Sequence, residues 1–269
     1  VNLMKNTHSE LYKILSLPLF WMGVAIVIGI SIFFTFQNIQ VINAIANGNT
    51  EIVKLEDMTS QLTKAQTVRD AILSSPYQSS ILFFPILFAL VLSTEYKFGQ
   101  ESLTKLLTPK WHTVLTGQIC SAIIVASTFT VVLSLINSAM LYVMLDERLQ
   151  DYLNIGLILE VTFRIIIFSI TLTLLSMLLV KITRKPIPSV IVIVSLLIIT
   201  LSGILRVVSP TLENLLPLIG AKSFAFGRVE NNNTSEVYGL LLLLSQASIV
   251  TIMMYIKDWY KNQRDKNYG

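Results

Sequence analysis

Residues 95–112 have the sequence Glu95-Tyr-Lys-Phe-Gly-Gln-Glu-Ser-Leu-Thr-Lys-Leu-Leu-Thr-Pro-Lys-Trp-His112, a polar stretch held between two long apolar runs. Two turn residues, Gly99 and Pro109, bracket a segment whose leucines recur at helical spacing. These leucines are Leu103, Leu106 and Leu107. A short amphipathic helix between two membrane spans is too small to form a core of its own. We therefore expect it to dock onto another molecule.

The composition of the chain indicates an integral membrane protein. Of its 269 residues, 53% are hydrophobic and 13% are charged, and the mean hydropathy is +0.68. Soluble domains carry about 25% charged residues, so a soluble fold of this length would have too few charges to face water. The net charge of +4 belongs to basic residues beside apolar runs, where they anchor topology and attract anionic lipid. It does not indicate nucleic-acid binding.

The apolar runs predict an all-α, polytopic membrane protein in one transmembrane domain, residues 1–269, with six spans. The expected spans are about 19–41, 78–95, 114–145, 155–181, 187–208 and 237–257. The short loop 181–185 is basic and the loop 146–151 is acidic. The positive-inside rule then places both termini and residues 95–112 in the cytoplasm.

Three further segments complete the predicted organisation. Residues 3–17 are amphipathic and stop before Pro18, which favours an interfacial helix over a frayed polar start of the first span. Residues 42–75 form a polar outer loop with a helical arm. Residues 209–230 are too apolar for a solvated loop and too interrupted for a span, which predicts a short re-entrant helical segment buried against protein.

The motifs of common enzymes are missing from the sequence. No glycine precedes a lysine, so the phosphate-binding loop of ATPases is absent. No His-Glu-x-x-His or Cys-x-x-Cys occurs, and His8, His112 and Cys120 lack the spacing of metal ligands. We expect a chain with no catalytic residues, no metal site and no cofactor of its own.

Glu160 and Arg164 are the charged residues deepest in a predicted span. Their i, i+4 spacing puts them on one helical face, where each neutralises the other. Two roles fit this intramembrane ion pair. It can face a substrate path or a partner subunit, or it can be a structural pair near the outer end of its span, which we favour.

The whole arrangement resembles the permease subunit of ABC type-2 transporters. The most specific similarity is an acidic residue closing the second span, then a glycine and a short helix ending near a proline and a basic residue. These positions are Glu95, Gly99, Leu103, Leu106, Leu107, Pro109 and Lys110. The resemblance implies that residues 99–109 are a coupling helix that fits a groove of a separate ATPase subunit.

The resemblance also implies the partners and the activity. Two copies of the ATPase would bind ATP and Mg²⁺, and a second permease chain, identical or a sibling, would complete the path. The expected function is export of a hydrophobic or amphipathic substrate (a peptide or bacteriocin, a drug or a lipid) across the bacterial cytoplasmic membrane. The alternative is a secondary transporter or membrane sensor protein that works without an ATPase.

Overall fold

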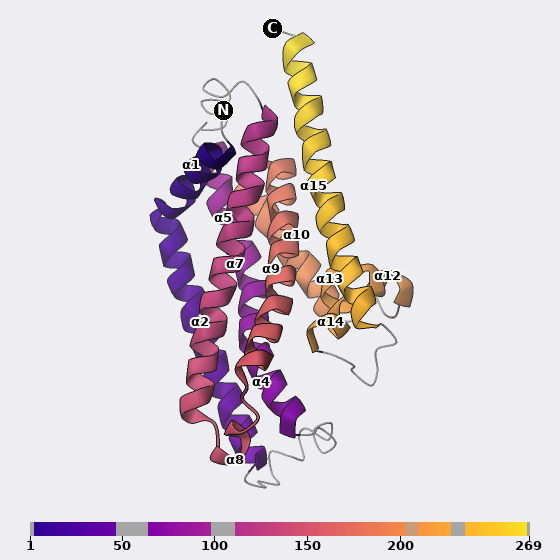
Figure 1. The fold of residues 1–269 in the computed structure, drawn as a ribbon. Coiled ribbons are helices and arrows are strands. Elements are labelled where there is room, and N and C mark those ends of the chain that lie inside the picture. Colours follow the sequence, from indigo (N-terminus) through magenta and orange to yellow (C-terminus); the bar gives the residue numbers. More distant parts are fainter. Residues whose placement is uncertain are drawn as a thin grey trace.

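The computed structural model describes residues 3–46, 64–97, 111–202, 204, 207, 209–226 and 235–267, and within these ranges it is helical throughout, without a strand. Five helices are long and apolar enough to cross a membrane, and they lie side by side in one bundle (Figure 1). They are α2 (Pro18–Ala46), α4 to α5 (Lys64–Lys97), α7 (Trp111–Met144), α9 (Ile155–Thr183) and α15 (Glu236–Asn267). The prediction of an all-α fold is confirmed for the described residues, and the five apolar helices are compatible with a multi-pass membrane protein.

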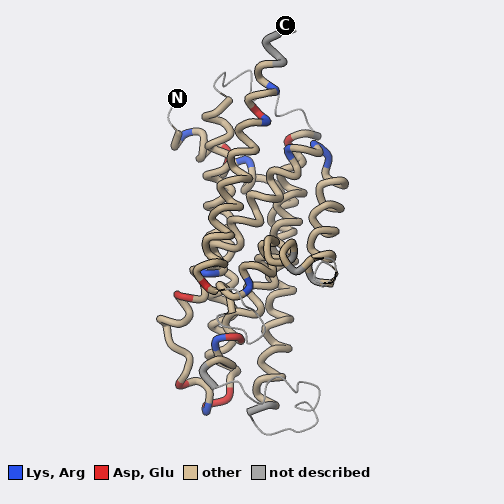
Figure 2. The backbone as a smooth tube through the Cα atoms, turned by 90° about the vertical axis from the view of Figure 1, so that its right-hand side faces the viewer, with Lys and Arg blue, Asp and Glu red and all other residues tan. Residues whose placement is uncertain are grey.

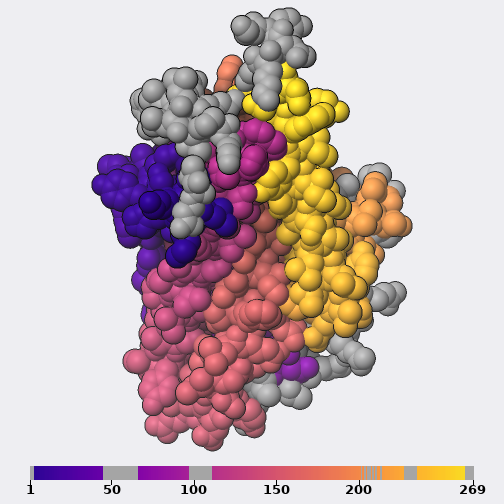
Figure 3. All heavy atoms as spheres, turned by 45° about the horizontal axis from the view of Figure 1, so that its top comes forward, coloured from indigo at the N-terminus to yellow at the C-terminus, as the bar shows by residue number. Residues whose placement is uncertain are grey.

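Helix α1 (Leu3–Leu15) lies at the end of the bundle that carries both termini (Figure 1). It buries Glu10 and Ile14 and exposes Met4 and Tyr12. Gly117 of α7 permits this packing, because a Cβ there would lie 3.1 Å from the Asn6 side chain. Figure 3 shows α1 in indigo next to the start of α7, with α15 in yellow running along the surface.

The second long helix is interrupted twice. It consists of α4 (Lys64–Gln78), a π-helical turn η1 (Ser79–Phe83) and α5 (Phe84–Lys97). Pro76 lies inside α4, and Pro85 is the second residue of α5, just after the π turn. Proline donates no backbone hydrogen bond, so neighbouring helices must satisfy the carbonyl that it leaves free.

Asn137 of α7 satisfies one of these carbonyls. Pro76 leaves the carbonyl of Ile72 without its intrahelical donor, and the Asn137 Nδ2 donates to that oxygen at 2.9 Å. The Asn137 Oδ1 in turn accepts from the Thr35 hydroxyl at 2.8 Å. The asparagine, which is 1% exposed, therefore joins α2, α4 and α7 in the interior of the bundle.

The core divides into two apolar clusters along the bundle. The cluster nearer the termini includes Phe84, Leu115, Leu133 and Met177, and Phe84 stacks on Phe129 at 4.4 Å between ring centroids. The cluster nearer the other end includes Ile72, Leu141, Ile165, Phe168 and Phe224. Helix α9 contributes to both and is the most buried of the five, whereas α2 and α15 expose much of their apolar surface, as lipid-facing helices do.

The predicted outer loop 42–75 differs from the structure at both ends. Helix α2 continues to Ala46, and α4 already begins at Lys64. Residues 47–63 lie outside the described part of the chain. Residues 64–75 belong to the second long helix because Val68 and Ile72 pack into the core.

In the acidic turn between α7 and α9, Asp146 caps α8 (Glu147–Gln150) by accepting a hydrogen bond from the Arg148 backbone N–H.

The expected fifth span, 187–208, differs as well. Helix α10 (Pro186–Leu201) has 16 residues and is about 24 Å long, shorter than the ~30 Å hydrocarbon core of a bilayer. Three short helices follow: α12 (Pro210–Leu215), α13 (Pro217–Gly220) and α14 (Lys222–Phe226). Among the described residues, five helices are of spanning length where the sequence predicts six spans, and α10 is a shorter apolar helix.

Charged residues of the described chain gather at two levels with an uncharged band between them (Figure 2). Along α9, Glu160 and Lys181 are about 32 Å apart, and Glu236 and Lys257 have the same separation along α15. This distance matches the hydrocarbon core. Exposed aromatic rings, typical of the membrane interface, lie close to the terminal level, among them Trp259.

Candidate functional site

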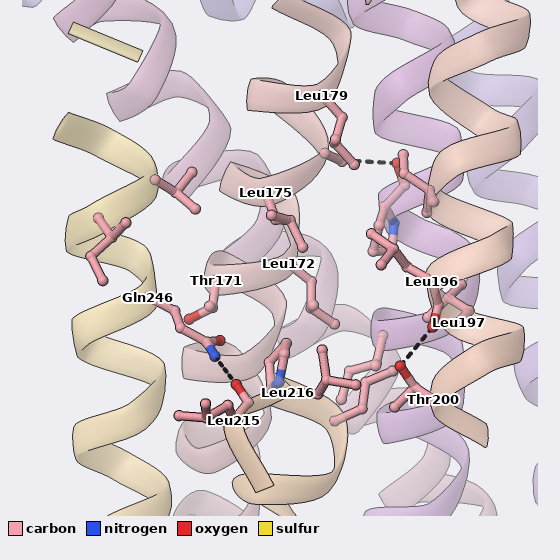
Figure 4. A pocket seen from close by; sticks show the side chains of 18 residues that line it. Thr171, Leu172, Leu175, Leu179, Leu196, Leu197, Thr200, Leu215, Leu216 and Gln246 are labelled. Carbon is pink, nitrogen blue, oxygen red and sulfur yellow. Dashed lines mark hydrogen bonds between the residues drawn. The ribbon is translucent and has the colours of Figure 1, made fainter. Parts of the chain in front are cut away.

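A cavity of about 290 Å³ lies between α9, α10 and α15 (Figure 4). The turn between α12 and α13 closes its lower side in this view, and α5 contributes Pro85 to the wall. Most lining side chains are aliphatic, among them Leu172, Leu175 and Leu197. The cavity therefore offers an apolar surface inside the helix bundle.

The polar side chains of the lining are occupied by backbone partners. The Thr171 hydroxyl donates to the Ile167 carbonyl at 2.9 Å, and the Thr200 hydroxyl donates to the Leu196 carbonyl at 2.6 Å. The Ser176 hydroxyl donates to the carbonyl of Pro85 at 3.1 Å. Because these hydroxyl hydrogens already have acceptors, the cavity favours an apolar group over a polar one.

Gln246 shows where the cavity lies along the membrane normal. Its Nε2 donates to the carbonyl of Leu215 at 2.5 Å (Figure 4). Gln246 is about 15 Å from Glu236 and about 16 Å from Lys257 along α15. The end of α12 therefore lies about midway between the two charged levels, and the amide of Gln246 satisfies a carbonyl that water would otherwise have to reach.

Glycine is needed where these short helices meet. A Cβ on Gly220 would lie 1.8 Å from the backbone oxygen of Asn214 and 2.6 Å from a methyl of Leu242. Gly239 similarly faces Phe224, whose Cβ would be 2.8 Å from an added methyl. The close approach lets α13 and α14 pack directly on α15 and fixes the lower wall of the cavity.

Glu160 and Arg164 are joined in a larger charged network. The Arg164 guanidinium contacts Glu160 at 2.7 Å and Glu236 at 2.9 Å, and it donates to the carbonyl of Phe224 at 2.5 Å. Arg69 reaches Glu160 at 3.2 Å. This network connects α4, α9, α14 and α15 at the charged level away from the termini, so the pair lies at the edge of the hydrocarbon region rather than in its middle.

Sequence spacing indicated only part of this network. The i, i+4 pattern brings Glu160 and Arg164 together within one helix. Arg69 and Glu236 are far away in the chain, and no local pattern marks them as partners of α9. Both glutamates are more than 40% exposed, so water weakens the ion pairs, whereas the Arg164 side chain is 15% exposed.

Of the predicted coupling residues, the structure describes Glu95. Its Oε2 accepts a hydrogen bond from the Gln118 Nε2 at 3.2 Å, and its carboxyl group lies beside Glu10 and Lys13 of α1. This arrangement ties the end of α5 to α1 and α7. The remaining members lie outside the described residues: Gly99, Leu103, Leu106, Leu107, Pro109 and Lys110.

Helix α15 is also attached at this end of the bundle. The hydroxyls of Thr116 and Tyr255 are 2.6 Å apart, and Lys181 pairs with Asp258 at 3.1 Å. The Lys257 ammonium donates to the carbonyl of Lys181. Four helices and α1 thus form a connected end, from which residues 98–110 emerge between α5 and α7.

Among the described residues, no group of three or more His, Cys, Asp or Glu side chains is arranged to hold a metal ion. Comparison with known protein families, with curated proteins and with solved structures finds no match for this chain.

Proposed function

We propose that this chain is the permease subunit of an ATP-driven exporter for a hydrophobic or amphipathic substrate. In this proposal, two copies of a separate ATPase subunit bind ATP and Mg²⁺, and a second permease chain, identical or a sibling, completes the transport path. The protein would lie in the bacterial cytoplasmic membrane with both termini in the cytoplasm. In this proposal, residues 187–208 are a sixth span and residues 209–230 are the re-entrant segment.

One observation carries the proposal: α5 connects the cavity wall to the segment expected to bind the ATPase. Pro85 lines the cavity and is about 18 Å from the end of α5 at Lys97. Residues 98–110 follow at once. Because an α-helix is stiff over this length, a displacement of that segment would move the cavity wall at Pro85.

The interrupted second helix supports the same reading. The π turn and Pro85 make a point at which α5 can change its angle relative to α4. Asn137 and the core cluster farther from the termini hold α4 in place. Helix α5 instead packs on α9 and α10, which line the cavity. ATP-driven closure of two partner subunits would tilt α5 about this point and change the shape of the cavity.

The experiment is a purification of the tagged full-length chain from its native membranes in mild detergent, followed by identification of co-purifying proteins and an ATPase assay. The proposal expects an ATPase subunit at about one copy per permease. Leu106→Asp with Leu107→Asp should release the ATPase while the chain still inserts in the membrane. A matched control is Leu135→Ala, because the Leu135 side chain of α7 is 60% exposed.

The same experiment distinguishes the ATP-driven permease from the alternative, a secondary transporter. A chain that transports its substrate after purification without any ATPase would be a secondary transporter, and the proposal would be wrong. An ATPase that remains bound and equally active with the Leu106 and Leu107 variants would contradict the coupling role of residues 99–109.

A further inference from the structure

The helices that enclose the cavity carry basic residues at their ends nearest the termini. Arg184 is about 8 Å beyond Leu179 of α9, and Lys257 is about 10 Å beyond Val250 of α15. Lys185, which precedes α10, is about 12 Å beyond Ile193. The apolar cavity therefore lies roughly three turns or less below a set of cations.

Lys257 lies among other basic residues at this end of the bundle. Lys257 is near enough to Arg184, Lys181 and Lys261 to be repelled by them, and among the described side chains Asp258 opposes this repulsion. Lys181 already pairs with Asp258. The side chains of Arg184 and Lys185 are exposed. Lys181 faces Asp258 and Glu95, so the charges of Arg184, Lys185 and Lys257 remain to attract an anion.

The cluster lies at the level of the lipid headgroups. Trp259 and Tyr260 directly follow it on α15, are 47% and 64% exposed, and form an edge-on pair 5.0 Å apart. Exposed aromatic residues at a helix end mark the interface of a bilayer. The cavity, in contrast, is at the level of the acyl chains, as Gln246 shows.

We propose that an anionic phospholipid binds here, with its phosphate group against Arg184, Lys185 and Lys257 and one acyl chain in the cavity between α9, α10 and α15. Charge complementarity selects the headgroup, because basic sites between membrane helices bind anionic lipid headgroups. The apolar lining selects the acyl chain, since a cavity lined mostly by aliphatic side chains takes an apolar occupant. The lipid comes from the leaflet on the side of the termini.

The inference rests on the proposed function in one respect, namely that the cavity is a binding site, and it names the ligand class of that site. Binding needs neither ATP nor a partner subunit. The test is therefore made on the purified chain alone, so that loss of lipid binding and loss of ATPase coupling are separate results.

The experiment is native mass spectrometry of the delipidated full-length chain titrated with phosphatidylglycerol or with phosphatidylcholine of the same chain length. We expect one tightly bound phosphatidylglycerol per chain and at least tenfold weaker binding of phosphatidylcholine. Arg184→Asn with Lys185→Gln should weaken the binding of phosphatidylglycerol about 25-fold, at roughly fivefold per charge. Asn is chosen because Arg184 has a φ of 54°, which Asn tolerates.

Matched variants separate the two halves of the site. Lys5→Gln removes one exposed charge from the same end of the molecule and should leave binding unchanged. Leu175→Trp should fill the cavity and abolish tight binding, whereas Leu135→Trp on the lipid-facing side of α7 should not. Thermal unfolding of each variant shows whether it is folded.

Three outcomes would overturn the proposal. Equal binding of the two lipids would exclude selection by charge. If Leu175→Trp is folded and binds phosphatidylglycerol as tightly as the parent protein, no acyl chain lies in the cavity. Displacement of the lipid by millimolar inorganic phosphate would show a site for the phosphate alone.

Discussion

Asn137 and Pro76 offer a direct test of how the interrupted helix is stabilised. Replacing Asn137 by Leu removes the bond to the Ile72 carbonyl at 2.9 Å, a weaker one to Ala71 at 3.3 Å, and the bond from Thr35 at 2.8 Å. Thr35 keeps other acceptors in Ser31 and Ser75. Interhelical bonds in membrane proteins average ~0.6 kcal/mol and reach ~1.7 kcal/mol, so Asn137→Leu should lower the unfolding free energy by about 2 kcal/mol.

About half of that loss should depend on Pro76. In Pro76→Ala, residue 76 regains a backbone N–H, which can donate to the Ile72 carbonyl within the helix. Asn137→Leu then leaves no bare carbonyl and should cost about 1 kcal/mol less than in the parent protein. The two substitutions should therefore show a coupling energy of about 1 kcal/mol.

The assay is equilibrium unfolding of the four proteins in mixed detergent micelles, followed by far-ultraviolet circular dichroism. Size-exclusion chromatography checks that every variant is monodisperse before unfolding. Equal costs of Asn137→Leu in the two backgrounds, within about 0.3 kcal/mol, would refute the reasoning. Such additivity would mean that the Ile72 carbonyl finds another donor when the asparagine is lost.

Two further predictions concern the packing of α13 on α15 and the charged network around Arg164. Gly220→Ala should lower the unfolding free energy by about 2 kcal/mol in the same assay, because its Cβ would meet the Asn214 oxygen at 1.8 Å, whereas Gly29→Ala, with nothing within 4 Å, should be neutral or stabilising. Arg164→Gln should lower the melting temperature more than Glu160→Gln, because Arg164 also holds Glu236 and the Phe224 carbonyl. If Arg164→Gln and Glu160→Gln lower the melting temperature equally, the contact between Arg164 and Glu160 alone matters.

Local patterns in the sequence were sufficient for the individual helices. Long apolar runs predict spans because a helix in lipid satisfies its own backbone, whichever neighbours it has. Pro18 predicts the start of α2, and the i, i+4 spacing predicts that Glu160 and Arg164 face each other. Each of these inferences involves residues within a few turns of one another, where helical geometry alone determines the neighbourhood.

Contacts between distant parts of the chain required the tertiary structure. Hydropathy treats 187–208 as one span, whereas α10 covers Pro186–Leu201 in the described part of the chain. No local rule connects Arg69 or Glu236 to α9, or Gln246 to the carbonyl of Leu215. These contacts depend on how five long helices cross, and that is decided by the joint packing of side chains from all of them.

The sequence by itself determined that this is a helical membrane protein and where its polar segment 95–112 lies in the chain. The tertiary structure decided what that segment is attached to. Helix α5, which leads into it, forms part of the wall of an apolar cavity through Pro85. The physical reason is that hydrophobicity and helical periodicity are local properties, whereas a cavity is a property of surfaces that the fold brings together.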